Sequence, residues 1–172
     1  GDFKPFDKNI AWNHPLHQQL IRDLSTQCEI GLHPSYASNT EVSRLEMEKK
    51  RLETILNKPV TSGRQHFLTL EIPATYERLL EEGFKNDYSL GYAENIGFRA
   101  GTAHPFLWFD LRTNSPTDLL IHPFAYMDGT LNEYMKSDRV HALELVKGLI
   151  VEVKKYGGEF SFLWHNESFA ES

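Results

Sequence analysis

The sequence predicts an α/β fold with a mostly parallel sheet, either open or closed as a barrel. Stretches with apolar residues at helical spacing alternate along the chain with short extended apolar runs. The length of 172 residues, 40% of them hydrophobic, suits one sizeable core and is short for two ordinary domains. Several histidines follow predicted strands directly, as expected where parallel strands present a ligand site at their carboxyl ends.

The first part of the chain is predicted to alternate helix, strand and helix. Residues 14–26 carry leucine and isoleucine at helical spacing, with a proline near the first turn, and predict an amphipathic helix. The short apolar run at residues 28–32 predicts a buried strand that ends at His33, because turn-forming residues follow it. Residues 41–56 predict a second helix with one apolar stripe and an opposite, solvated face that includes Glu48.

The middle of the chain repeats this order and then becomes less regular. Residues 64–70 are predicted to be extended, and Pro73 is predicted to open a short helix that Gly83 ends. Glycine, proline and asparagine then separate four short extended segments. These are residues 87–90, 98–102, 106–111 and 119–121.

A long helix and a last strand are predicted near the end of the sequence. Residues 138–156 predict a helix that places Leu143, Val146, Ile150 and Val153 on its buried face. Residues 160–164 predict a strongly apolar strand that ends at His165. Because no internal repeat, linker or low-complexity segment is visible, the sequence predicts a single domain over residues 1–172.

Composition and charge exclude several classes of protein. The formal net charge is −6, from 18 Lys+Arg and 24 Asp+Glu, and no basic run is present, so nucleic acid and anionic membranes are poor partner predictions. The single cysteine, Cys28, excludes an internal disulfide and a cysteine-based zinc site, and favours a reducing, cytoplasmic compartment. No signal-peptide pattern and no membrane-spanning run is seen, so we expect a soluble chain. Phosphate-cradling glycine motifs and the G-x-S-x-G nucleophile motif are also missing.

Histidines provide the main indication of a functional site. If the strands run in one direction, imidazoles that follow them converge on one end of the sheet. Neutral imidazole is a common ligand for zinc, nickel, cobalt and iron, although each histidine alone is equally well explained by hydrogen bonding in the fold. Five histidines lie at or just beyond predicted strands: His33, His66, His104, His122 and His165.

Other polar residues extend this prediction. Arg64 and His66 alternate in an extended segment, so they point to one face and together suit a carboxylate or a substrate oxygen. Asp87 is either a turn residue or the carboxylate that holds a catalytic histidine in its tautomer. His165 is suited to proton exchange near neutral pH, or is simply a packed histidine. The aromatic residues, among them Trp164, suit a sugar ring but are more often core.

Four segments in order resemble the polysaccharide deacetylases, the NodB-homology carbohydrate esterases. Residues 29–39 (EIGLHPSYASN) resemble the second motif of the family, which implies that His33 ligates a metal. Residues 56–67 (LNKPVTSGRQHF) and 72–89 (IPATYERLLEEGFKNDYS) resemble the run that carries the third and fourth motifs, here Arg64 and Asp87. Residues 160–168 (FSFLWHNES) resemble the last strand, which implies that His165 is the general acid.

The resemblance implies a deformed (β/α) barrel that is incomplete at its N-terminus. The first motif of the family is an apolar strand that ends in paired aspartates, and neither Asp2 nor Asp7 lies in such a strand. Ala37 stands where the second motif usually has another histidine. The chain therefore resembles the C-terminal major part of one such domain.

The activity implied by the resemblance is metal-dependent hydrolysis of N-acetyl or O-acetyl groups on a carbohydrate, with a divalent metal, zinc first. The alternatives are a catalytically inactive carbohydrate-binding or scaffold module of the same fold, and an unrelated metal-dependent hydrolase on a similar barrel. A carbohydrate is the expected partner, and the oligomeric state is left open. The predicted site residues are His165, Asp87 and Arg64 for catalysis, His33 and His66 for the metal, and His122, Trp164 and Tyr36 for substrate.

Overall fold

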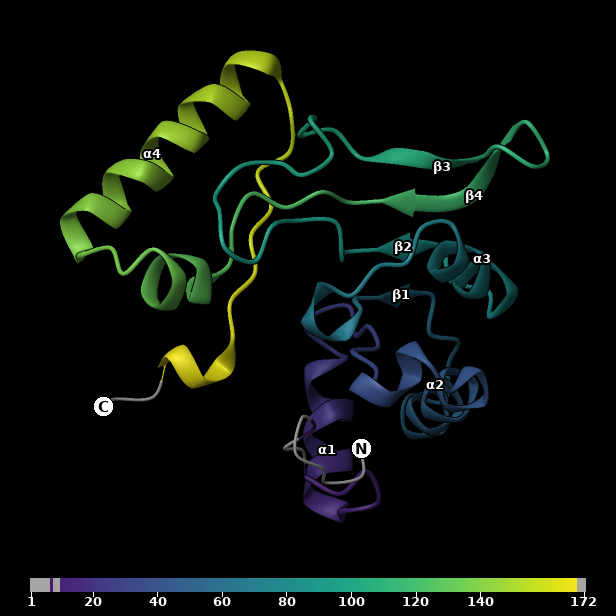
Figure 1. Cartoon of the computed structure of the whole chain (residues 1–172). Helices are drawn as coiled ribbons and strands as arrows, with labels where there is room; N and C mark the ends of the chain where they lie inside the picture. Colours follow the sequence, from purple (N-terminus) through teal and green to yellow (C-terminus); the bar gives the residue numbers. More distant parts are fainter. Residues whose placement is uncertain (1–6, 8–9, 170–172) are drawn as a thin grey trace.

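The structure is a computed structural model that describes residue 7 and residues 10–169. Asp2, considered above for the first motif, lies outside the described residues. Figure 1 places the first and last long helices at opposite ends of the molecule, with the sheet between them. The α-helices are α1 (Pro15–Leu24), α2 (Val42–Leu56), α3 (Ala74–Glu81) and α4 (Arg139–Tyr156).

Four strands form one mixed sheet in the order β1-β2-β4-β3. The β1–β2 and β2–β4 pairs are parallel, whereas β3 runs antiparallel to β4. The predicted α/β class is confirmed, but in the described part of the chain the sheet is open and does not close into a barrel. The strands are β1 (Ser62–Gly63), β2 (Asn86–Asp87), β3 (Phe106–Asp110) and β4 (Ser115–Ile121).

Two predicted strands are reduced to single parallel bridges, Leu32 with Gly63 and Met127 with Leu163. The prediction of a buried strand at residues 28–32 is wrong in extent, because Cys28 and its neighbour are exposed and only the last residue of the run is buried. The predicted strand at residues 160–164 is likewise reduced to its one bridge. Leu32 thus runs parallel to β1, whereas the partner of Leu163 lies outside the four strands.

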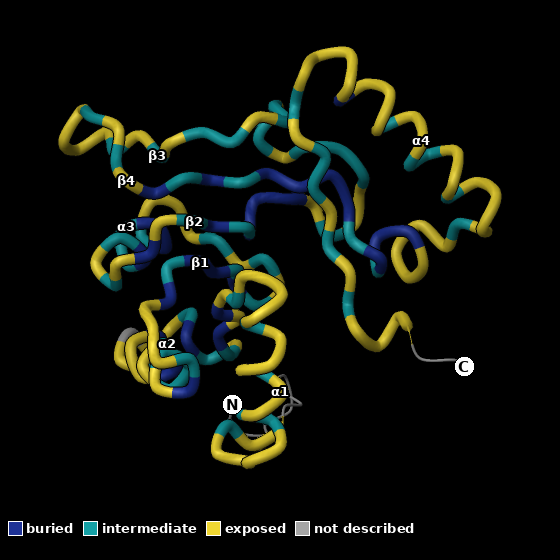
Figure 2. The backbone as a smooth tube through the Cα atoms, turned by 180° about the vertical axis from the view of Figure 1, so that it is seen from behind, coloured by how far each residue is buried: buried dark blue, intermediate teal, exposed yellow. Residues whose placement is uncertain are grey.

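The main core lies between the sheet and helices α2 and α3. Gly63 is required there, because a Cβ atom at this position would lie 2.9 Å from a ring carbon of Phe84. A second cluster forms where α4 packs on Tyr126 and Leu131. Figure 2 shows buried chain concentrated along the sheet and exposed chain along α1 and α4. The buried members of the main core are Leu32, Leu45, Val60, Tyr76, Leu79, Phe84, Leu90, Leu119 and Ile121.

Three helices are confirmed in position, but their predicted faces need correction. In α2, Glu48 is buried rather than solvated, because its carboxylate accepts a hydrogen bond from the Ser35 backbone N–H at 2.8 Å. In α4, Leu143 and Ile150 are exposed, since the side of the helix that packs on the second cluster carries Leu145 and its helical neighbours. In α1, no residue is buried, so its apolar stripe is largely exposed.

The remaining differences concern short segments. Residues 64–70 are not extended, because a 3-10 turn at His66–Leu68 follows β1 directly. Phe67 and Leu68 both take φ 54°, the left-handed region that side chains rarely adopt. Residues 98–102 form turns instead of a strand. Among the described residues, no helix has the length and apolar character needed to cross a bilayer.

Candidate functional site at the carboxyl edge of the sheet

Chemically active side chains follow the parallel segments of the sheet at the same edge. Because β1, β2 and β4 run in one direction, the residues that follow them emerge at one end of the sheet (Figure 1). Leu163, which precedes His165 by two residues, lines the same cavity as His33 and Arg64. Arg64 and His66 follow β1, and Asp128 follows the bridge at Met127. Two further histidines follow single bridges: His33 comes after the bridge at Leu32, and His165 comes two residues after the bridge at Leu163.

His33 and His66 form a direct imidazole pair. The Nδ1 of His33 lies 2.8 Å from the carbonyl oxygen of Arg64, which only accepts, so His33 carries a proton on Nδ1. In the neutral ring, Nε2 is then an acceptor, and it lies 2.9 Å from Nδ1 of His66. The predicted metal-binding pair therefore meets in space, although the two residues are 33 positions apart in the chain.

Asp7 supports this pair from the other side. Its carboxylate is 3% exposed, accepts a hydrogen bond from the Tyr36 backbone N–H at 2.9 Å and lies 3.8 Å from Nε2 of His66. The sequence analysis did not assign Asp7, because a single aspartate in a polar stretch carries no local signal. Only the tertiary approach to His66 identifies it.

The surroundings of His33 keep its ring neutral. Loss of hydration inside the protein, with the positive charges of Arg64, His66 and His165, lowers the pKa of His33 to about 4, although the bond to the Arg64 carbonyl partly opposes this. The imidazole is therefore uncharged at neutral pH, and its Nε2 lone pair accepts the hydrogen bond from His66.

His33 and His66 together could offer a divalent metal two nitrogen ligands, one fewer than the three protein ligands usual at a catalytic zinc. His33 Nε2 and His66 Nδ1 face each other, while the outer nitrogens of the two rings face the Arg64 carbonyl and the Asp7 carboxylate. Such acceptors behind the rings are typical of metal-binding histidines. No group of three or more His, Cys, Asp or Glu side chains suited to a metal is found within residue 7 and residues 10–169.

Asp128 holds His165. The Asp128 carboxylate is 2% exposed and accepts from the His165 backbone N–H at 2.9 Å, and its Oδ1 lies 2.5 Å from His165 Nδ1. The Ser168 hydroxyl donates to the same carboxylate. The ionised carboxylate accepts the Nδ1 proton, which leaves Nε2 of the ring for proton exchange. The sequence analysis missed Asp128, whose pairing joins residues 37 positions apart.

Asp87 does not orient His165, and this correction has a structural reason. Asp87 is paired in register with Gly63 and Ile121, so it faces the core between the sheet and the helices. Its carboxylate is fully buried and accepts from the backbone N–H and hydroxyl of Ser89, at 3.0 and 2.6 Å. Burial raises the pKa of Asp87 to about 6, and the Ser89 bonds oppose this only in part.

A cavity of about 370 Å³ is lined by His33 and Arg64. Because side chains alternate along a strand, Tyr88 faces this cavity while the preceding Asp87 faces the core. The lining residues that carry polar side chains are Glu29, His33, Ser62, Arg64 and Tyr88.

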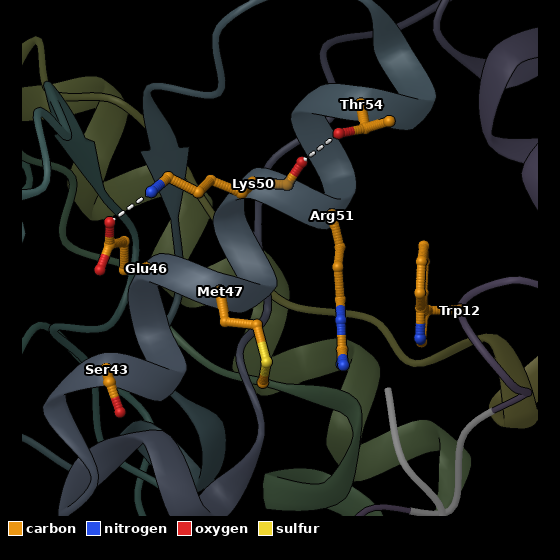
Figure 3. A pocket seen from close by; sticks show the side chains of 7 residues that line it. All are labelled: Trp12, Ser43, Glu46, Met47, Lys50, Arg51 and Thr54. Atoms are coloured by element: carbon orange, nitrogen blue, oxygen red, sulfur yellow. Dashed lines mark hydrogen bonds and ion pairs between the residues drawn. The ribbon is translucent and has the colours of Figure 1, made fainter.

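Another pocket of about 370 Å³ lies on the outer side of α2 and contains no predicted site residue. Figure 3 shows the Lys50 and Glu46 ion pair there, with Arg51 beside the Trp12 ring at 4.9 Å. It is separate from the histidine site.

The predicted substrate-binding residues are only partly brought together. Tyr36 is half exposed next to Asp7, and Trp164 is half exposed next to His165. His122 instead stacks on Tyr88, with ring centroids 4.3 Å apart, and its Nε2 lies 2.9 Å from the Asn86 side-chain oxygen. His104, counted above among the strand-end histidines, contacts the Tyr156 carbonyl beside α4 and lies outside the site.

Solved structures resemble this arrangement. A proposed polysaccharide deacetylase from Mycobacterium smegmatis superposes with a TM-score of 0.63 at 19% identity, over 87% of this chain and 54% of that chain. The chain has a polysaccharide-deacetylase-like fold. An allantoinase superposes with a TM-score of 0.57 at 15% identity, over 87% of this chain and 49% of that chain.

Among the comparisons, the structural one supports the resemblance to deacetylases that the sequence predicts. No protein-family model matches the chain, and no curated protein matches it in sequence. The chain spans about half the length of the solved structures that it resembles. The activity is therefore argued from the site itself.

Proposed function

We propose that the chain takes part in metal-dependent hydrolysis of N-acetyl or O-acetyl groups on a carbohydrate. One observation carries the proposal: the Asp128–His165 pair and the His33–His66 pair emerge at the same edge of the sheet in a deacetylase-like fold. The Asp128–His165 pair suits proton transfer, and the His33–His66 pair suits a metal ion.

A divalent metal, zinc first, is proposed to be held by His33 Nε2 and His66 Nδ1. The Arg64 carbonyl holds His33 in the ligand tautomer, and the Asp7 carboxylate near Nε2 of His66 would stabilise a proton there once Nδ1 gives up its own to bind the ion. When bound, such an ion polarises a carbonyl and makes water more acidic.

His165 is proposed as the catalytic acid and base. Asp128 holds its Nδ1–H, so Nε2 accepts a proton from the attacking water and returns it to the departing amine or hydroxyl. The bond between the acetyl carbon and the leaving nitrogen or oxygen breaks, a carbon–oxygen bond to water forms, and acetate is released. Arg64 lies close enough to Asp128 for their charges to attract, which favours an ionised Asp128.

The substrate is proposed to lie against Tyr36 and Trp164, which are partly exposed and lie next to the Asp7 carboxylate and to His165 in the chain, respectively. His122 is kept as a proposed substrate contact only through Tyr88, on which it stacks. The deformed (β/α) barrel also belongs to this proposal. In support, Leu32 bridges in parallel to Gly63 on the outer side of β1, where a barrel would continue.

The test is acetate release from an N-acetylated chito-oligosaccharide by metal-stripped protein, with and without added zinc. We expect zinc to restore release, and His165→Ala and His33→Ala each to abolish it. His104→Ala is the matched control, because His104 lies outside the site. Oligosaccharide binding without acetate release would favour the inactive module, and hydrolysis of allantoin alone would contradict the carbohydrate substrate.

A further inference from the structure

The short helix Asn166–Phe169 folds back on the strand end that carries His165. The Ser168 backbone N–H donates to the His165 carbonyl at 3.1 Å, and the Phe169 ring lies against Trp164, with centroids 5.8 Å apart. These two contacts set the position of Ser168. Its hydroxyl reaches the Asp128 carboxylate, 40 residues away in the chain.

The Asp128 carboxylate accepts several hydrogen bonds. Oδ1 lies next to His165 Nδ1, while Oδ2 accepts from the His165 backbone N–H and from the Ser168 hydroxyl. The Gly129 backbone N–H also donates to it. A carboxylate offers about four acceptor sites, so these donors leave this buried group little freedom to rotate.

We propose that Ser168 is a positioning residue, which fixes the rotation of the Asp128 carboxylate and thereby the tautomer and orientation of His165. Ser168 is the side-chain donor to Oδ2, so without it Oδ2 keeps backbone donors alone. The helix Asn166–Phe169 is then part of the site and not a trailing end. The consequence for catalysis depends on the proposed function, whereas the positioning of His165 does not.

The charges around Asp128 support this role. Burial acts to raise the pKa of Asp128, but the bonds from Ser168 and His165 outweigh it and hold the pKa below its ordinary value. The charged and titratable groups that face the pair are Arg64, which attracts Asp128, and His33, which interacts with His165. Loss of the Ser168 hydroxyl is therefore expected to raise the pKa of Asp128.

The test uses Ser168→Ala and Ser168→Thr in the full chain, with Glu167→Ala as a control on the same short helix. Imidazole nitrogen spectra report the tautomer of His165, and carboxyl carbon titration reports Asp128. We expect Ser168→Ala to raise the pKa of Asp128 and to move part of His165 out of the Nδ1–H form. Ser168→Thr keeps a hydroxyl and should restore both signals, while Glu167→Ala should leave both unchanged.

Kinetics separate this inference from the proposed function. If acetate is released, we expect Ser168→Ala to lower kcat about tenfold with KM unchanged. If the wild type releases none but the spectra change as expected, the proposed function fails and the positioning role stands. Spectra of Ser168→Ala that match those of the wild type, or a change equally large in Glu167→Ala, would overturn the inference.

Discussion

Two buried aspartates differ in place and in pKa, one on the face of the sheet that packs on the helices and one beyond its carboxyl edge. Asp87 faces the helices, accepts only from Ser89 and has a raised pKa, near 6. Asp128 emerges at the carboxyl edge, accepts from His165, Ser168 and Gly129, and has a lowered pKa. Both side chains are almost inaccessible to solvent, but Asp87 lies deeper in the protein and loses more hydration, whereas Asp128 accepts from more donors, so the two pKa values shift in opposite directions.

The largest effect should come from exchanging the two carboxylates for amides. Asp128→Asn is expected to lower kcat/KM for acetate release about 10⁴-fold, because an amide no longer selects the Nδ1–H form of His165. Asp87→Asn should change it less than about threefold in the folded fraction. Steady-state kinetics measures kcat/KM for each variant, and thermal unfolding checks that the variant is folded. An equal loss of kcat/KM in the two variants would contradict the distinction between Asp87 and Asp128.

The next effect concerns stability. The folded-state pKa of Asp87 is raised from 3.8 to about 6, so the stability it contributes is full below pH 4 and is lost as the pH rises through about 6. Urea unfolding at pH 4 and pH 7 should show the wild type losing about 3 kcal/mol relative to Asp87→Asn. Asp128 has the opposite sign, because its stabilisation is lost only as the pH falls through its lowered folded-state pKa. If the difference in the free energy of unfolding between the wild type and Asp87→Asn is the same at pH 4 and pH 7, the pKa of Asp87 is not raised in the folded protein.

Metal binding should separate the histidines at the edge from those elsewhere. His33→Ala is expected to weaken zinc binding about 100-fold or more in calorimetric titration, because one of two facing nitrogens is removed. Asp7→Asn should weaken it less, since Asp7 acts through His66. His104→Ala should leave it unchanged, and equal loss in that variant would indicate nonspecific binding.

The smallest effect is expected at the aromatic side chains. Trp164→Ala and Tyr36→Ala should each raise KM for a chito-oligosaccharide about tenfold with little change in kcat, because stacking on an aromatic ring contributes about 1 kcal/mol. Phe109→Ala is a suitable control, since Phe109 is comparably exposed on β3. The initial-rate dependence on oligosaccharide concentration measures it, and a fall in kcat alone would argue against stacking.

Local signals predicted the helices well. The side chain of Asp138 caps α4 by accepting from the backbone N–H groups of Val140 and His141, and left-handed Gly157 ends that helix. These features depend on neighbours in sequence. Which helix face is buried depends on packing partners, so the prediction for Leu143 was wrong although the helix itself was right.

Site residues could be predicted where they directly follow a parallel segment. They could not be predicted where their role depends on which distant segments pair. His33, Arg64 and His66 each follow a parallel segment and do meet. The choice between Asp87 and Asp128 depends on the bridge of Met127 to Leu163, which no local pattern encodes. The alternation of side chains already placed Asp87 and Tyr88 on opposite faces, and that signal could have excluded Asp87.

The most direct test of the account is a crystal structure of the chain grown with zinc and an N-acetylated chito-oligosaccharide. The account predicts anomalous zinc density between His33 Nε2 and His66 Nδ1, with an acetamido group within hydrogen-bond reach of His165 Nε2. Zinc bound away from this pair, with the sugar remote from His165, would contradict a single site at the carboxyl edge of the sheet.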